Sequence, residues 1–500
     1  MSDHKKNPSK RYVNDLNRFS AMSGTSLGLQ GKLVPFTLAI VFLILAGFFG
    51  NINLHVTPEH IFMIVAASVI GGYMALNIGA NDVANNMGPA VGGKVLTVTA
   101  AVLIAAIFES AGALLAGGDV VKTVAKGIIS ADSGIDVYVF RYLMLSALLA
   151  AALWINLATY LNAPVSTTHS IVGGVMGGGI GAAGFGIVNW STMSKIAASW
   201  VISPVFGGIV AALLLLVIKT RILNKPDRNL AARKWVPVLI GLMGGALTAY
   251  MAMKGLKKIW KPDMLTIILA SLGMFVLGWV GSISYIAGKA AKIGNKKKEI
   301  YTLFNLPLII GVALLCFAHG ANDVANAVGP LAAIVSTFSD APADAKISIP
   351  IWVMMIGAIG LALGLLLFGP KLINTVGQKI TRLNAPRAYS VALASAITVL
   401  IATSFGLPVS STHIAIGAIF GVGFLREYLE YPNKKRMKPG HMLNHTAEDA
   451  FDNISVRMKR KLVRRRFVYS IAAAWIITVP ASALLSATLF YVLMFLAPTG

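Results

Sequence analysis

Long apolar segments constrain this chain more than any other feature of its sequence. They recur from Val34 to the C-terminus, and most approach the roughly 20 residues that an α-helix needs to cross a bilayer. Hydrophobic residues make up 56% of the 500 residues and charged residues only 12%, whereas soluble domains are about one-quarter charged. The sequence therefore predicts an all-α polytopic membrane protein with about 12 membrane segments and excludes a soluble or disordered chain. The candidate segments lie near residues 34–50, 60–79, 95–117, 141–161, 170–188, 194–218, 235–253, 264–286, 301–318, 350–369, 389–407, 412–425 and 467–496.

The charge distribution indicates how the segments are oriented. The net charge of +24 comes from short basic runs between apolar segments, a pattern typical of the positive-inside rule and of contacts with lipid headgroups. No basic-aromatic module is present, so we expect the lipid bilayer as a partner and no nucleic acid. We expect a multi-pass protein of the plasma membrane, the inner membrane of a bacterium, with its N-terminus cytoplasmic and its C-terminus external. The basic loops expected inside are 219–234, 289–298, 371–387 and 426–466, and the weakly acidic loops expected outside are 119–136 and 336–349.

One basic run contradicts this orientation. Four lysines between residues 254 and 261 would lie outside, where the positive-inside rule predicts few cations. The sequence alone offers no explanation for them.

The strongest organisational signal is an internal repeat. The sequence Gly-Ala-Asn-Asp-Val-Ala-Asn occurs at 79–85 and again at 320–326, and Pro-Val-Ser-Thr-Thr-His at 164–169 returns as Pro-Val-Ser-Ser-Thr-His at 408–413. The offsets of 241 and 244 residues divide the chain into two related halves. Because the charges place the start of the first half outside and the start of the second inside, the repeats are inverted, as in many secondary transporters. The expected divisions are a basic cytoplasmic tail (1–33), an extra transmembrane helix with its loop (34–59), the first repeat (60–218), a linking helix pair with basic loops (219–300), and the second repeat (301–500) with the basic loop 426–466.

Each copy of the first motif places polar residues deep in an apolar stretch. An aspartate in hydrocarbon costs several kcal/mol unless it is paired, hydrated or neutralised. Flanking residues such as Gly79, Gly88 and Pro89 are expected to break the helix, and unpaired backbone is tolerated only where it lines a cavity in the protein. The amides offer donors and acceptors, and the aspartates could supply the negative ligand for a cation or a proton. Helix packing through buried polar residues is the alternative, but it does not explain two copies. The residues are Asn81, Asp82 and Asn85 in the first half and Asn322, Asp323 and Asn326 in the second.

The second motif predicts a tight hairpin inside the membrane, followed by a helix. Hydroxyl groups and free backbone N–H groups at the start of a helix form an anion site. Simple N-capping of a buried helix is the alternative for either copy alone, and the pairing of two such starts with two Asn-Asp clusters favours the anion site. The histidines that follow, at 169 and 413, are expected to be core residues. The hydroxyl residues are Ser166, Thr167 and Thr168 in the first copy and Ser410, Ser411 and Thr412 in the second.

One further carboxylate lies within an apolar segment. Glu109 has no charged counterpart, because the corresponding residue of the second half is Leu361. We therefore expect a one-sided role for it, structural or in cation coupling. The sequence contains no P-loop, zinc-protease or nucleophile-elbow motif, so we expect no enzyme and no cofactor, and an ion gradient as the source of energy.

The duplicated signatures closely resemble those of the PiT family of inorganic phosphate transporters, over both repeats and most of residues 60–496. The resemblance implies broken helices, intramembrane hairpins, alternating access, a homodimer, and symport of phosphate with Na⁺ or H⁺. It implies that Asp82 and Asp323 couple the cation, and Na⁺ could bind there. Sodium-coupled members often carry a glutamate where this chain has Met144 and Ala392, which leaves H⁺ open. The phosphate ligands implied by the motif match are the amides and hydroxyls of Asn81, Asn85, Ser166, Thr167, Thr168, Asn322, Asn326, Ser410, Ser411 and Thr412, with Asp82 and Asp323 beside them.

Two other functions remain open at this point. The same scaffold could carry sulfate or another oxyanion, although phosphate near neutral pH can donate a hydrogen bond to an aspartate and sulfate cannot, which favours phosphate. The chain could alternatively be a transport-dead phosphate sensor that signals through the loop 426–466, a segment whose charge is also typical of a solvated linker.

Overall fold

The computed structural model describes residues 29–54, 57–129, 134–161, 165–255, 262–338, 349–379, 383–430 and 465–497. Over these ranges the chain is helical apart from its connections and one isolated β-bridge between Ile129 and Val188. Eleven of the described helices are long and apolar enough to cross a membrane, which confirms the all-α polytopic prediction. The tail 1–28, the loop segment 339–348 and most of the basic loop, 431–464, lie outside the described residues.

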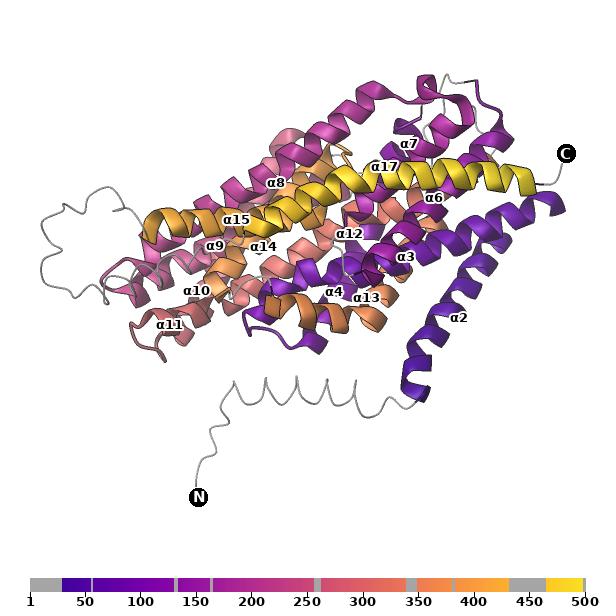
Figure 1. Ribbon diagram of the computed structural model, residues 1–500. Helices are drawn as coiled ribbons and strands as arrows, with labels where there is room; N and C mark the ends of the chain where they lie inside the picture. The colour runs from indigo at the N-terminus through magenta and orange to yellow at the C-terminus, as the bar shows by residue number, and fades with distance from the viewer. Residues whose placement is uncertain are drawn as a thin grey trace, which may run out of the picture.

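The long helices are α2 (Leu29–Asn53), α3 (Pro58–Gly92), α4 (Val98–Ala116), α6 (Val137–Tyr160), α7 (Thr167–Ala183), α8 (Trp190–Ile218), α9 (Arg228–Tyr250), α10 (Met264–Ala290), α12 (Asn305–Ser336), α13 (Ile351–Lys379), α14 (Ala385–Ser404), α15 (Ser411–Glu430) and α17 (Arg465–Leu496), and the short ones are α5 (Gly118–Lys122) and α11 (Lys297–Ile300). They form an elongated bundle in which α17 crosses the front over α6 and α7, and α2 leans against α3 (Figure 1). Helices α7 and α15, which start at the two expected hairpins, are not among the spanning candidates.

The two halves of the chain interlock. Helix α3 of the first half packs on α13 of the second, and α12 of the second half packs on α4 of the first. The helices that follow the hairpins do the same, because α7 packs on α17 and α15 packs on α8. Neither half could therefore bury its own helices without the other.

Glycines at matching positions allow the closest of these crossings. A Cβ atom on Gly79 would lie 2.0 Å from the carbonyl oxygen of Leu361, and one on Gly320 would lie 2.0 Å from that of Glu109. Gly79 corresponds to Gly320 at the repeat offset, and Glu109 corresponds to Leu361. The same contact is therefore formed twice, once with the glycine in the first half and once with the glycine in the second. A two-fold relation between the halves would produce this pattern.

The helices after the hairpins repeat this reciprocity. A Cβ on Gly177 of α7 would lie 2.2 Å from the carbonyl oxygen of Ala483 in α17, and one on Gly421 of α15 would lie 1.9 Å from that of Gly208 in α8. Small residues at helix interfaces let backbones approach closely in membranes, where packing replaces the hydrophobic effect as the driving force. The many glycines of α7 thus serve helix contact.

The expected helix breaks at the first motif are absent. Helix α3 runs without interruption from Pro58 to Gly92, and α12 runs from Asn305 to Ser336. The break was predicted because glycine and proline weaken helices, but Gly79 is required by a backbone contact rather than by a change of direction. The prediction of broken helices at these motifs is wrong, since tertiary packing holds both helices together.

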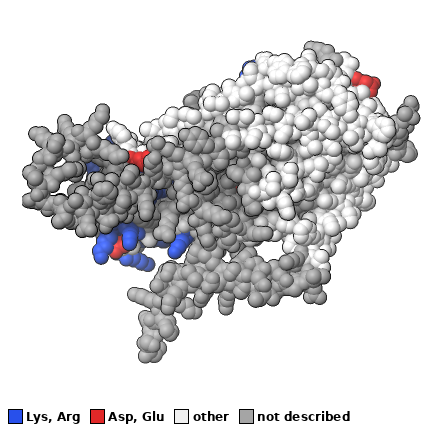
Figure 2. All heavy atoms as spheres, in the orientation of Figure 1, with Lys and Arg blue, Asp and Glu red and all other residues white. Residues whose placement is uncertain are grey.

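The first of the four lysines between residues 254 and 261 has an acidic partner in the structure. Lys254 Nζ lies 2.9 Å from Asp119 Oδ2, and Asp119 belongs to a loop that the sequence places outside. The other lysines of that run lie outside the described residues. On the described surface, charged side chains gather toward the ends and leave a broad uncharged area between them (Figure 2), as a membrane-spanning protein requires.

The Gly79→Ala substitution should destabilise the protein. Its methyl group would meet the Leu361 carbonyl oxygen at 2.0 Å, and overpacking of this kind costs about 1–3 kcal/mol. Thermal unfolding of the detergent-purified protein would measure the loss. Gly88→Ala is the matched control on the same helix, because nothing lies within 4 Å of its added Cβ and alanine favours a helix over glycine. Equal melting temperatures for the two variants would contradict the close crossing.

Candidate functional site

The first serine of each hairpin motif caps a helix. Ser166 Oγ accepts a hydrogen bond from the backbone N–H of His169 at 3.2 Å, and Ser410 Oγ accepts one from that of His413 at 3.3 Å. Both serines precede helices in the way that N-cap residues do. The capping interpretation therefore holds for the serines, while the next two hydroxyl residues of each motif point into a shared polar cluster.

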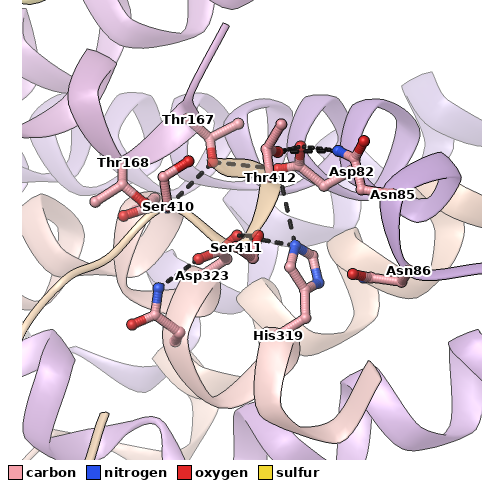
Figure 3. A network of polar contacts seen from close by, with 12 residues as sticks. Asp82, Asn85, Asn86, Thr167, Thr168, His319, Asp323, Ser410, Ser411 and Thr412 are labelled. Atoms are coloured by element: carbon pink, nitrogen blue, oxygen red, sulfur yellow. Dashed lines mark hydrogen bonds and ion pairs between the residues drawn. The ribbon is translucent and has the colours of Figure 1, made fainter. Parts of the chain in front are cut away.

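Asp82 of α3 receives a hydroxyl group from each hairpin (Figure 3). Thr167 Oγ1 donates to its Oδ2 at 3.2 Å, and Thr412 Oγ1 donates to its Oδ1 at 3.0 Å. Asn85, one turn further along α3, donates its Nδ2 to Thr412 Oγ1 at 2.9 Å. A first-half carboxylate and amide are thus bound to a second-half hydroxyl.

Asp323 of α12 occupies the corresponding position in the second half. Ser411 Oγ donates to its Oδ2 at 3.0 Å, and Asn322 Nδ2 lies 2.6 Å from its Oδ1. Asn326 Nδ2 donates to Thr168 Oγ1 at 3.1 Å, which again joins an amide of one half to a hydroxyl of the other. The cluster therefore needs both halves, as the duplicated motifs predict.

His319 joins the two carboxylates, and the sequence analysis missed it. Its Nε2 lies 2.8 Å from Asp323 Oδ2 and 3.8 Å from Asp82 Oδ2, and its Nδ1 lies 3.2 Å from Glu109 Oε1. Its side chain is fully buried. The available signal was a titratable residue at the end of an apolar run, directly before Gly320, the first residue of the second copy of the Gly-Ala-Asn-Asp-Val-Ala-Asn motif.

Glu109 extends the cluster on one side only. Asn86 Nδ2 donates to Glu109 Oε1 at 2.8 Å, which links α3, α4 and α12 in a chain of buried polar groups. A buried ion pair needs such additional hydrogen bonds to offset desolvation. The counterparts of Asn86, Glu109 and His319 in the other half are apolar: Ala327, Leu361 and Ile78.

Asn81 and the hairpin histidines lie beside this cluster. Asn81 is half-buried and forms no hydrogen bond within the described residues. His169 and His413 are buried, and their ring centroids lie 5.0 Å apart. The Trp200 ring contacts His169 in a tilted arrangement, with 3.8 Å between the centroids. The two histidines pack between the hairpins, in positions typical of the core histidines that we expect.

The arrangement can hold opposite charges close together. One ligand atom each from Asp82, His319 and Asp323 lies within 4.8 Å of the other two, so a cation could replace or accompany the imidazole between the carboxylates. Hydroxyl and amide groups surround them and can donate to an oxyanion. The donor set thus fits an anion and a cation bound side by side.

Glu109→Leu should destabilise the folded protein. It removes the acceptor of Asn86 and the carboxylate beside His319, and breaking a buried pair costs about 3–5 kcal/mol. Glu109→Gln keeps an oxygen acceptor for Asn86 and should lose less. Thermal unfolding would compare the two, with Ile107→Leu on the same helix as control, because Ile107 is 66% exposed. A Leu variant as stable as the control would show that Glu109 supports no buried network.

Comparisons with known proteins identify the family of this chain. Residues 78–486 match the family model described as the phosphate transporter family. A candidate phosphate permease of Helicobacter pylori is 42% identical and covers 96% of this chain and 99% of its own. Inorganic phosphate transporter 2-1 of the Arabidopsis thaliana chloroplast is 36% identical over 84% of this chain and 70% of its own.

A solved structure has the same fold. It is described as the sodium-dependent phosphate transporter, is 33% identical in sequence, and superimposes with a TM-score of 0.75 over 87% of this chain and 99% of its own. Together with the family match over most of the chain, this shows that the chain belongs to the phosphate transporter family.

Proposed function

We propose that the protein is a secondary active transporter that imports inorganic phosphate by symport with H⁺ or Na⁺. The observation that carries this proposal is the shared cluster, in which Asp82 of the first half binds Thr412 of the second, and Asn326 of the second half binds Thr168 of the first. A site formed by both repeats near the centre of the membrane is typical of inverted-repeat transporters.

The anion would bind to the hydroxyl and amide donors. Thr167, Thr168, Ser411 and Thr412 lie at the starts of α7 and α15, where the helix dipoles favour negative charge. Thr167, Ser411 and Thr412 donate to the aspartates, and Thr168 donates to the carbonyl oxygen of Val409. An oxyanion therefore has to compete for these hydroxyls. Phosphate has an advantage over sulfate, because its own O–H group can donate to a carboxylate that has given up a hydroxyl partner.

The cation would offset the charge of the carboxylates. Asp82 and Asp323 are both buried, and bringing an anion beside them is unfavourable without added positive charge. Binding of Na⁺ or H⁺ at the carboxylates, with Glu109 beside them, makes phosphate binding depend on the cation. The name of the structural relative, the sodium-dependent phosphate transporter, supports Na⁺. H⁺ stays an alternative coupling ion, because this chain has the apolar residues Met144 and Ala392 where sodium-coupled members of the family often carry a glutamate.

Alternating access would follow from the reciprocal contacts. Two halves that form the same crossings can exchange their arrangements at small cost, so that the cluster faces each side of the membrane in turn. We place the protein in the plasma membrane, as a homodimer with its N-terminus cytoplasmic and its C-terminus external.

Asp82→Asn and Asp323→Asn should each lower phosphate uptake at least tenfold. An amide cannot carry the charge that attracts the cation, and it is a weaker acceptor for the phosphate O–H group. Initial rates in liposomes that contain equal amounts of folded protein would measure the effect.

Asp136→Asn is the matched control for both variants. Asp136 caps α6 outside the cluster, and asparagine caps helices equally well, so uptake should be unchanged. Normal transport by both of the cluster variants would show that the carboxylates do not form the site.

Uptake driven by separate gradients would identify the coupling ion and the substrate. Liposomes that contain only this protein receive labelled phosphate with either a Na⁺ gradient or a pH gradient. We expect one gradient to drive accumulation, and unlabelled phosphate to compete better than sulfate. Stronger competition by sulfate would assign the site to that oxyanion, and no uptake in sealed liposomes under either gradient would favour a sensor.

A further inference from the structure

One face of α3 is polar well before the helix reaches the cluster. Tyr73, Asn77, Asn81 and Asn85 follow one another at intervals of four residues and therefore share one face. All four are half-buried, whereas the residues between Tyr73 and Asn77 are buried. Tyr73 lies nine residues before Asp82, about 13 Å along the helix axis. The face thus leads from the cluster toward the start of α3.

Neighbouring polar groups extend this face onto α6. The Nδ2 group of Asn156 donates a hydrogen bond to the Tyr73 hydroxyl. The Nδ2 atom of Asn77 is itself buried and has no hydrogen-bond partner among the described residues. Buried amide groups are normally hydrogen-bonded to protein or water. The described protein leaves this N–H group without a partner, and water entering along the face would supply one.

The equivalent face of α12 differs. The residues that correspond to Tyr73 and Asn77 are Leu314 and Ala318, and both are buried. Further along the helix, Asn322 and Asn326 are also buried. The approach to the cluster is therefore polar and partly open along α3, but apolar and closed along α12.

Polar side chains at this depth in a membrane have few environments. Facing lipid would leave their hydrogen-bonding groups unpaired at a cost of several kcal/mol, whereas an aqueous cavity would satisfy them. We propose that Tyr73, Asn77 and Asn156 line a water-filled access route through which the oxyanion reaches the cluster from the side at which α3 begins. Neutral N–H and O–H donors suit an anion in transit, because they can replace part of its hydration without holding it as tightly as a cation would.

Only the identity of the anion rests on the proposed function. The existence of the aqueous route can be tested without any transport assay, so its failure and the failure of phosphate transport are distinguishable.

Cysteine labelling tests the route directly. The only cysteine of the chain, Cys316, is buried in α12 and would be replaced by alanine as background. In this background, Asn77→Cys and Tyr73→Cys are exposed to a charged, water-soluble methanethiosulfonate reagent in lipid nanodiscs, which leave both membrane faces accessible. Ala318→Cys and Leu314→Cys are the matched controls at the equivalent positions of α12.

We expect the α3 variants to react at least tenfold faster than the α12 variants. Added phosphate should slow the labelling of Asn77→Cys. Protection by sulfate and not by phosphate would support the route but identify sulfate as the anion that uses it. Equal rates at the two helices would overturn the proposal. So would labelling of the α3 variants by a lipid-soluble maleimide alone, since that would show a surface that faces lipid.

A transport measurement distinguishes a role of Asn77 in substrate access from a role in stabilising the protein. Asn77→Asp places a negative charge in the route and should raise the phosphate concentration for half-maximal uptake at least fivefold, with the maximal rate largely kept. Asn77→Ser restores a neutral donor and should recover most of the affinity. A fall in maximal rate alone, with unchanged half-saturation in both variants, would contradict a role in access.

Discussion

The rest of this structure depends on two buried carboxylates inside a bundle of apolar, membrane-spanning helices. Hydrocarbon offers Asp82 and Asp323 no hydrogen-bond donors, so the protein itself has to supply them. Hydroxyl groups at the starts of α7 and α15 do so, which explains why two hairpins reach the centre of the bundle. Because Thr412 of the second half binds Asp82 of the first, and Asn326 of the second half binds Thr168 of the first, the cluster forms only when the two halves are assembled.

The close helix crossings make that assembly possible. Gly79 and Gly320 allow two long helices to lie against the backbone of the opposite half, and this contact positions the polar residues that follow each glycine. The same contacts occur twice, so the arrangement of these helices is nearly symmetric. In the alternating access that we propose, such an arrangement would exchange two conformations of similar energy.

The side chains between these helices differ between the two halves, and the differences lie near the two aspartates. His319 and Glu109 form a buried pair, whereas the equivalent residues of the other half, Ile78 and Leu361, are apolar. The polar face of α3 likewise has an apolar counterpart on α12. The cation coupling that we propose uses the duplicated pair Asp82 and Asp323, whereas the access route rests on the difference between α3 and α12.

The sequence by itself determined the membrane class, the duplication and most members of the cluster, because composition, apolar length and repeated motifs are local properties. It did not reveal that α3 and α12 pass through their motifs unbroken, because Gly79 is explained by the carbonyl of Leu361, a residue far away in the chain. His319 was missed because its contacts with Asp82 and Glu109 form only in the folded protein, and its place directly before the motif does not by itself separate it from a core histidine. Only the tertiary structure decided which hydroxyls meet which carboxylates, because those contacts depend on how the two halves cross.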